Sequence, residues 1–238
     1  EMLESGEWEP QTFEVFDKFI DDRTTFLDIG GWIGSTALYG AQLAERTLVF
    51  EPDPSARIEL DRNVNLNLEK GFLRNIRVYP HAIAPESGKV ELGFRTGSGD
   101  SMSSVLLDSE NKTTVESISF AQIISDYDLS EQKLFIKMDV EGFEYDILSS
   151  LGDLPDKLKN ATFFISFHPQ FLLEKLRKDE RSEAQVRAQF FNIHKAVFKV
   201  FKNYRSTYIN GNPFKFKKEM AKSLITGQFP REVIFAPR

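Results

Sequence analysis

The sequence predicts an α/β fold in which helices cover both faces of a mostly parallel β-sheet. Short apolar segments rich in β-branched and aromatic residues alternate with longer segments whose apolar residues recur every three or four positions. With 238 residues, 41% of them hydrophobic, the chain is long enough to bury one sizeable core. The absence of cysteine excludes a disulfide scaffold, a thiolate metal site and a cysteine nucleophile.

The first half of the chain shows this alternation most clearly. Phe13, Phe16 and Ile20 lie three to four residues apart and predict a helix over residues 10–20. Ser35 follows a glycine-rich turn and is placed to cap the next helix. The other elements predicted here are a strand over residues 24–29, a helix over 35–45, a strand over 47–50, a helix over 56–68 and a strand over 76–79.

The second half begins with a less regular region. Residues 89–95 alternate like an exposed strand, and residues 113–118 are placed to pair with them as a hairpin across a loop rich in Gly and Ser. The most strongly apolar strand covers residues 134–140. The remaining predicted elements are helices over 120–127, from Phe143 and over 181–201, and strands over 162–167, 206–209 and 232–235.

These elements form one continuous pattern. We therefore expect a single domain over residues 1–238, with a helical segment over 1–22 ahead of an α/β core over 23–238. No apolar run approaches the ~20 residues that a membrane helix needs. No charged-apolar-small signal segment opens the chain, and the expected location is the cytoplasm.

Charge is distributed unevenly along the chain. The formal net charge of −6 argues against generic nucleic-acid binding. Residues 151–238 nevertheless hold 17 Lys and Arg against 8 Asp and Glu, a net +9 that leaves −15 for residues 1–150. Lys199 and Lys202 are therefore candidate contacts for an anionic substrate, although a solvated helix face beside core aromatic residues is the reading we favour.

Polar, titratable residues stand at the carboxyl ends of several predicted strands. In a parallel sheet these ends meet at one edge, where α/β proteins bind their ligands. The residues concerned are Asp28, Glu51, His81, Asp139, Glu141 and His168. Core packing alone does not produce such a pattern, and the sequence therefore predicts a ligand site at this edge.

The turn after the first strand suits a ligand that approaches the backbone closely. Gly30, Gly31 and Gly34 allow that approach, and Glu51 at the end of the next strand suits a ribose diol. A dinucleotide is disfavoured because the G-x-G-x-x-G spacing is missing and because Asp28 would repel phosphates. S-adenosylmethionine carries an ammonium and a sulfonium but no phosphate, so the negative charge of Asp28 attracts it, and it is the favoured ligand. The alternative is a tight turn in which Asp28 is only a local cap.

The second informative segment surrounds the strand over residues 134–140. Alternation along that strand places Lys137, Asp139 and Glu141 on one side. A lysine inside an apolar strand is costly unless it is paired, and these two carboxylates are the predicted partners. The group is either a structural ion pair or a charged cluster beneath the transferred methyl group.

At this point the sequence resembles the FkbM-type family of S-adenosylmethionine-dependent methyltransferases, over roughly residues 8–236. The segments that carry the resemblance are Phe26-Leu-Asp-Ile-Gly-Gly-Trp-Ile-Gly34, Val49-Phe-Glu-Pro-Asp-Pro54, Gly99-Asp-Ser-Met-Ser-Ser104 and, most specifically, Ile136-Lys-Met-Asp-Val-Glu-Gly-Phe-Glu144. The resemblance implies a class I methyltransferase fold. This fold is a Rossmann-like three-layer sandwich around a seven-stranded, mostly parallel sheet with the last strand antiparallel.

The resemblance also implies roles for individual residues. Asp28, Gly30 and Gly34 would flank the methionine part of the cofactor, and Glu51 would hold the ribose. His81 and Ala82 would border the adenine, and Asp139 and Glu141 would face the reacting centre. Gly31 and Pro52 are further cofactor-binding candidates. Ser103 and Ser104 in the Ser-rich segment are candidate substrate contacts. Trp32 departs from the family, whose turn most often has an Asn there.

The predicted function is that of an S-adenosylmethionine-dependent O-methyltransferase acting on a hydroxyl of a sugar, a glycan or another small metabolite. One alternative is the same fold kept as a binding or scaffold module without activity. A less favoured alternative is an NAD(P)-dependent oxidoreductase, because the dinucleotide fingerprint is missing.

Methyl transfer to a hydroxyl requires a proton acceptor. The resemblance favours Asp139 as the residue nearest the chemistry, whereas the ordinary pKa of imidazole, near 6.5, favours His168. The choice between them stays open from the sequence, and Glu141 is the third candidate catalytic residue. Asp139, Glu141 and His168 could in principle ligate a hard cation, but no motif fixes their spacing, and no metal site is predicted.

Overall fold

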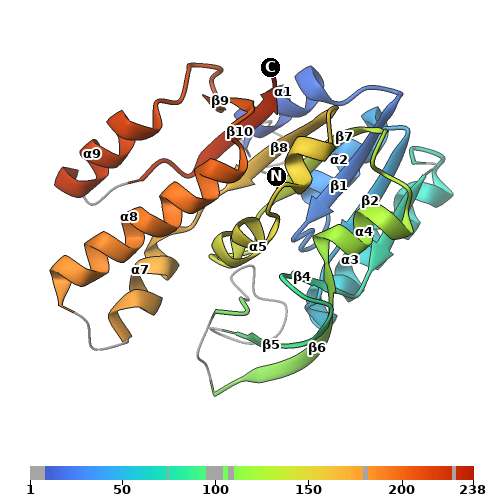
Figure 1. Cartoon of the computed structure of the whole chain (residues 1–238). Helices are drawn as coiled ribbons and strands as arrows, with labels where there is room; N and C mark the ends of the chain where they lie inside the picture. The colour runs from blue at the N-terminus through green and yellow to red at the C-terminus, as the bar shows by residue number, and fades with distance from the viewer. Residues whose placement is uncertain (1–8, 74, 95–103, 107–109, 179–181, 227–228) are drawn as a thin grey trace.

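A computed structural model describes residues 9–238 except 74, 95–103, 107–109, 179–181 and 227–228. Its main sheet has seven strands in the described residues, in the order β3-β2-β1-β7-β8-β10-β9 (Figure 1). The strands are β1 (Thr24–Ile29), β2 (Arg46–Phe50), β3 (Ile76–Tyr79), β7 (Lys133–Met138), β8 (Ala161–Ser166), β9 (Tyr204–Tyr208) and β10 (Glu232–Pro237). β10 is antiparallel to both of its neighbours, and the other described pairs of this sheet are parallel. The predicted sheet with an antiparallel last strand is confirmed.

Helices cover both faces of the main sheet because its central strands are apolar on both sides. Phe26 of β1 packs with α1 (Pro10–Phe19) and α2 (Ser35–Leu43), and α3 (Pro54–Glu69) packs beside α2 on the same face. Leu27 and Ile29 of the same strand face the other way. They pack with α4 (Phe120–Asp126), α5 (Glu144–Ser150) and α8 (Glu183–Val200).

The aromatic residues of the C-terminal third belong to the core. Phe201 stacks on Phe235 of β10 with ring centroids 4.0 Å apart, and Phe163 of β8 meets Phe201 edge-on at 5.0 Å. The hydroxyl of Tyr204 donates to the carbonyls of Pro155 and Leu158. These rings therefore anchor α8 and β9 to the sheet, and the basic residues between them lie on the outside.

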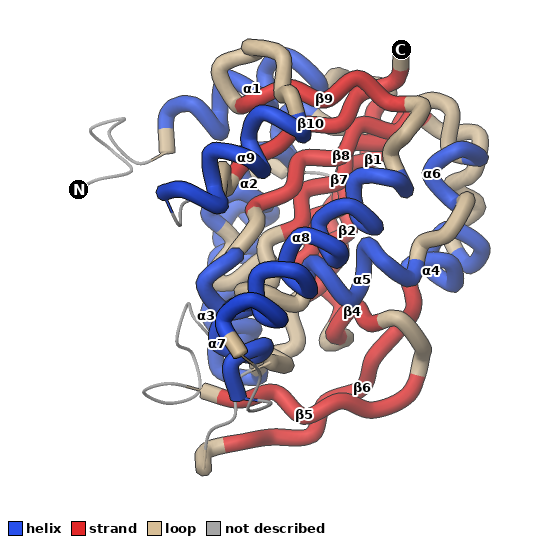
Figure 2. Tube along the Cα trace, turned by 60° about the vertical axis from the view of Figure 1, so that its left-hand side comes forward, coloured by secondary structure: helices blue, strands red, loops and turns tan. Residues whose placement is uncertain are grey.

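A second sheet of three strands, in the order β4-β6-β5, lies beyond the end of the main sheet (Figure 2). It contains β4 (Ala82–Ala84), β5 (Gly88–Gly93) and β6 (Lys112–Ser119). The predicted hairpin of β5 and β6 is confirmed by their antiparallel pairing. β4 pairs in parallel with β6 and was not predicted, because three residues are too short to show a period.

Several helix boundaries differ from the prediction. α2 begins after Gly34, whose left-handed backbone (φ 98°) forms the N-cap, so Ser35 is the first helical residue and not the cap. α8 begins at Glu183 behind a capping box formed by Ser182 and Gln185, while the predicted start at residue 181 lies outside the described residues. Helices not predicted from the sequence are α6 (Leu154–Lys157), α7 (Pro169–Lys178) and α9 (Phe216–Thr226).

Among the described residues, every helix is too short or too polar to cross a bilayer.

Candidate active site

A cavity of about 380 Å³ opens at the carboxyl ends of β1, β2 and β7. It is bounded on another side by β4 and by the segment after β5, so both sheets contribute to its wall. The predicted site residues that line it are Gly30, Gly31, Glu51, Pro52, His81, Ala82, Ser104, Asp139 and Glu141. The fold thus brings most of the predicted cofactor residues to one cavity.

Gly30 and Gly31 form the floor of this cavity where three strands approach one another. Both backbone amides donate to the carbonyl of Phe50, at 3.0 and 3.3 Å. Gly30 has a φ of 83°, and a Cβ atom there would lie 1.9 Å from the carbonyl oxygen of Asp139. A Cβ atom on Gly31 would lie 2.3 Å from Cγ1 of Val49. These glycines are therefore required for strand packing as well as for access to the cavity.

Glu51 is held rigidly at the rim of the same cavity. Its carboxylate accepts from the backbone amides of Trp32 and Asp53, each at 2.8 Å, and Trp32 adopts a left-handed φ of 45° in doing so. Burial raises the pKa of Glu51 to about 7, although the two amide hydrogen bonds oppose the shift. A carboxylate has about four acceptor sites, so capacity remains for a ligand hydroxyl.

Asp28 is buried and bonds to the protein itself. Its two oxygens accept from Nζ of Lys137 at 3.1 Å and from Oγ1 of Thr36 at 2.8 Å. Two parts of the prediction are corrected here. Asp28 does not line the cavity, and the hydrogen-bonded carboxylate partner of Lys137 is Asp28, not Asp139 or Glu141. Gly34 likewise lies away from the cavity, against Leu60.

Lys137 places a compensated positive charge under the glycine turn. Its ammonium group also donates to the carbonyl of Gly30 at 3.3 Å. Burial alone would lower the pKa of Lys137, but the charges of Asp28 and Asp139 outweigh burial and raise it. The ammonium therefore stays charged, and the bonds from Lys137 to Asp28 and Gly30 hold the turn against β7.

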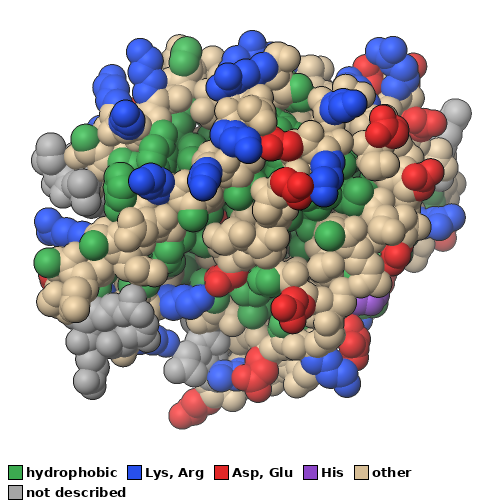
Figure 3. Space-filling view, in the orientation of Figure 1, with side chains coloured by type: hydrophobic (Ala, Val, Ile, Leu, Met, Phe, Trp, Pro, Cys, Tyr) green, Lys and Arg blue, Asp and Glu red, His purple; other side chains and the backbone are tan. Residues whose placement is uncertain are grey.

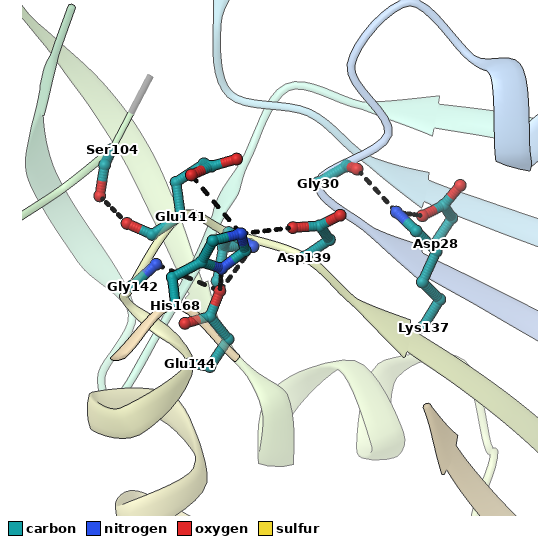
Figure 4. A network of polar contacts seen from close by, with 10 residues as sticks. Asp28, Gly30, Ser104, Lys137, Asp139, Glu141, Gly142, Glu144 and His168 are labelled. Atoms are coloured by element: carbon teal, nitrogen blue, oxygen red, sulfur yellow. Dashed lines mark hydrogen bonds and ion pairs between the residues drawn. The ribbon is translucent and has the colours of Figure 1, made fainter. Parts of the chain in front are cut away.

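A second group of polar residues lies beyond Asp139 (Figure 4). Nδ1 of His168 is 2.9 Å from Oε1 of the buried Glu144, while Nε2 is 3.6 Å from both Oδ1 of Asp139 and Oε2 of Glu141. Oε1 of Glu144 also accepts from the backbone amides of Val140 and Gly142. The imidazole therefore stands among three carboxylates at the start of α7.

This environment changes the acid–base character of His168. Burial alone would lower the pKa of His168. Its hydrogen bond to Glu144 and the charges of Glu144, Asp139 and Glu141 outweigh burial and raise the pKa to about 9. The imidazole accordingly carries a proton at neutral pH in this structure. The ordinary imidazole pKa that the sequence argument used does not apply to His168, because the fold brings three carboxylates from elsewhere in the chain to its ring.

A second cavity, of about 420 Å³, lies on the other side of Asp139. Its wall is mostly polar and comes from α1, from the end of β8 and from the start of β10; its residues include Gln11, Thr12, Ser166, His168, Arg231 and Glu232. Glu9, Asp139 and Glu141 line both cavities. Two ligands, one in each cavity, would therefore meet at Asp139.

Of the predicted substrate contacts, Ser104 lies in the site, whereas Lys199 and Lys202 lie outside it. Ser104 is buried in the first cavity wall, and its hydroxyl donates to the carbonyl of Glu141 at 2.8 Å, whereas Ser103 lies outside the described residues. Lys199 and Lys202 are exposed and line neither cavity, and Lys202 pairs with Asp156 at 3.3 Å. Figure 3 shows Lys and Arg gathered over α8, β9 and α9.

Sequence reasoning missed Glu144 and the wall of the second cavity. Glu144 ends the most specific motif of the sequence, and an acid in the first turn of a helix is a recognisable signal. Arg231, Gln11 and Thr12 reach the site from the two ends of the chain. No local pattern marks them, because only the antiparallel placement of β10 and the packing of α1 bring them there.

Comparison with known proteins places this geometry in a family. One similar solved structure is a crystal structure of the methyltransferase FkbM from Methylobacillus flagellatus KT, which is 16% identical to this chain with a TM-score of 0.51. The match covers 90% of this chain but 44% of that protein. SMU.1697c of Streptococcus mutans, crystallised with SAH, is 10% identical (TM-score 0.46, 96% of this chain and 97% of that one). An rRNA methylase from Streptococcus thermophilus is 9% identical (TM-score 0.44, 95% and 93%).

No curated protein matches the sequence. The family model described as the methyltransferase FkbM domain matches residues 28–204, which include the glycine turn, Glu51, Asp139, Glu141 and His168. The main sheet has the strand order and the antiparallel last strand of class I methyltransferases. This match covers well over half of the chain, and the chain therefore belongs to the methyltransferase FkbM domain family.

Proposed function

We propose that the protein transfers a methyl group from S-adenosylmethionine to a hydroxyl of a sugar, a glycan or another small metabolite. The observation that carries the proposal is the position of Asp139, which lines both the cavity with the glycine turn and the polar cavity beside it. A cofactor in the first cavity and an acceptor in the second would have their reacting groups on either side of this residue.

The residues of the first cavity fit S-adenosylmethionine. Its volume of about 380 Å³ lies within the usual range for small-molecule sites. Gly30 and Gly31 leave room for the methionine part, Glu51 would accept from the ribose hydroxyls, and Ala82 would border the adenine. The cofactor supplies a methyl group on a positively charged sulfur, and the acids around the cavity favour that charge.

The polar second cavity suits an acceptor with several hydroxyl groups. Its wall offers both donors and acceptors of hydrogen bonds, among them Gln11, Arg231 and Glu232. Holding the acceptor oxygen in line with the methyl group and the sulfur supplies much of the rate acceleration. Asp139 is the proposed proton acceptor, because its carboxylate lines both cavities and its backbone amide bonds to Ile29, directly before the glycine turn.

Substituting Asp139 tests the proposed chemistry. We expect Asp139→Asn to slow methyl transfer by about 10²- to 10⁴-fold, the usual contribution of a general base, with cofactor affinity changed only a few-fold. His168→Ala is expected to slow transfer less. The measurement is transfer of a labelled methyl group to a panel of sugars, glycans, phenols and RNA, together with calorimetric titration of S-adenosylhomocysteine.

Asp153→Asn, which removes an exposed acid outside both cavities, is the control and should leave both quantities unchanged. Cofactor binding without transfer to any acceptor would support a scaffold role instead. A preference for nicotinamide dinucleotides would support an oxidoreductase. Full transfer by Asp139→Asn would refute the assignment of the base.

Glu51 predicts how cofactor affinity depends on pH. Because the pKa of Glu51 is about 7, its carboxyl is increasingly protonated below neutral pH and loses acceptor capacity for the ribose hydroxyls. Affinity for S-adenosylhomocysteine should fall by up to about tenfold per pH unit below that pKa. Glu51→Gln should bind more weakly and lose this pH dependence.

The free energy of unfolding of the unbound protein should change in the opposite direction. The folded pKa of Glu51 is raised from 4.5 to about 7, so the folded state binds the extra proton between these values and loses stability as the pH rises through them. Calorimetric titrations at several pH values measure the affinity, and urea unfolding measures the stability. An affinity that is the same on both sides of neutrality would contradict the role given to Glu51.

A further inference from the structure

We propose that Asp139, Glu141 and His168 form a binding site for one divalent metal ion that accepts mixed oxygen and nitrogen ligands, such as Mn²⁺. Each residue offers one ligand atom, and the three atoms lie within 4.8 Å of one another. Two carboxylates with one imidazole suit a hard or borderline divalent cation. The sequence alone predicted no metal site, because the fold and not a local motif brings these residues together.

Two of the distances between the ligand atoms are close to those that such an ion requires. An octahedral ion with bonds of about 2.1 Å holds neighbouring ligand atoms roughly 3.0 Å apart, and a tetrahedral one about 3.4 Å. Nε2 of His168 is 3.6 Å from Oδ1 of Asp139 and from Oε2 of Glu141. Both distances to Nε2 therefore exceed these values by about half an ångström or less, and the two carboxylate oxygens, which lie within 4.8 Å of each other, would have to approach the ion as it binds.

The orientation of His168 is a second observation that points to a metal. Metal-binding histidines commonly donate their other ring nitrogen to a carboxylate, which fixes the tautomer and the direction of the ligand nitrogen. Nδ1 of His168 makes this bond to Glu144, whose side chain is fully buried and is itself held by two backbone amides. Glu144 is therefore a positioning residue that turns Nε2 toward Asp139 and Glu141.

The third observation is that the buried atom Oδ1 of Asp139 has no hydrogen-bond partner among the described residues. A proton on Nε2 of His168 would neutralise part of the negative charge. At 3.6 Å, however, it makes no hydrogen bond to Oδ1. Buried polar atoms are nearly always satisfied, and a metal ion bound between these atoms would satisfy this one.

The position of the site suggests what the ion would do, and this part rests on the proposed function. Asp139 and Glu141 line both cavities, so the ion would bind the acceptor hydroxyl oxygen beside the cofactor methyl group. The hydroxyl would give its proton to the second oxygen of Asp139. Its oxygen would form the new bond to the methyl carbon as the carbon–sulfur bond breaks, and sulfur would leave as a neutral thioether.

Titration of the EDTA-treated protein with Mn²⁺, followed by electron paramagnetic resonance, tests the site without cofactor or acceptor. We expect one bound ion per chain and, in pulsed spectra, the modulation that a coordinated imidazole nitrogen produces. His168→Gln should abolish the nitrogen signal, and Asp139→Asn should weaken binding. Glu144→Gln should weaken binding by about 10- to 100-fold, as for other residues that orient a metal ligand.

Asp153→Asn, at an exposed acid paired with Lys157, is the control and should bind Mn²⁺ like the parent protein. Absence of a bound ion, or a bound ion without the nitrogen signal, would overturn the three-ligand site. These results come from the parent protein and do not depend on whether a variant folds. Mn²⁺ binding without methyl transfer would refute the proposed function alone, whereas unchanged transfer after EDTA treatment would refute the catalytic role of the metal.

Discussion

Replacement of Gly30 by alanine should destabilise the protein by about 4 kcal/mol or more, which is among the largest effects that single substitutions produce. The left-handed backbone at this position (φ 83°) costs an alanine about 1–2 kcal/mol by itself. The added Cβ atom would also lie 1.9 Å from the carbonyl oxygen of Asp139. Because that oxygen belongs to the backbone, β1 and the end of β7 would have to move apart. Urea or thermal unfolding measures the change.

Gly152→Ala is the matched control for this substitution. Gly152 also has a left-handed backbone, with a φ of 56°, but no atom of the described residues lies within 4 Å of the position that its Cβ would take. Gly152→Ala should therefore lose only the roughly 1–2 kcal/mol that a left-handed backbone costs an alanine. Equal losses of stability in the two variants would show that the contact between Gly30 and Asp139 is not tight. If Gly30→Ala does not fold, the control still shows that a left-handed alanine is tolerated.

Removal of the Lys137 charge should destabilise the fold by about 3–5 kcal/mol, because Asp28 would be left as a buried charge without its ion-pair partner. Lys137→Met keeps most of the side-chain volume. Combining it with Asp28→Val removes both charges, and the double variant should lose less stability than the sum of the two single variants. A double-mutant cycle from urea unfolding measures this coupling.

Lys133→Met offers a comparison on the same strand. Nζ of Lys133 pairs with Asp21 at 2.9 Å, but both side chains are partly exposed, by 41% and 37%. Exposed ion pairs usually contribute about 0–1 kcal/mol, so this variant should be nearly as stable as the parent protein. A loss at Lys137 no greater than the loss at Lys133 would show that water reaches the buried pair.

The fold was predictable wherever an element carried a strong local signal. β1 and β7 each contain a short apolar run, Phe26-Leu27 and Leu134-Phe-Ile136, and the structure has both as strands. α7 was not predicted, although Phe171, Leu172 and Leu176 recur at helical spacing. β4 had no period to detect, and its pairing with β6 depends on a contact between distant segments.

The candidate site was predictable as an edge of the sheet but not as a set of contacts. The carboxyl ends of the strands did bring Glu51, Asp139 and His168 to the edge where the two cavities lie. The partner of Lys137 depended on register, because Asp28 and Lys137 are directly opposite on β1 and β7. Register between parallel strands follows from packing and cannot be read from either strand alone.

The arrangement of the two cavities around one shared wall has a kinetic consequence. Neither cavity contains the other, since most of their lining residues differ and, among the residues that the structure describes, Glu9, Asp139 and Glu141 are the ones common to both. With a donor in one compartment and an acceptor in the other, each partner could enter or depart while its counterpart stays in place. Steady-state rates would then follow a random ternary-complex scheme rather than a compulsory order.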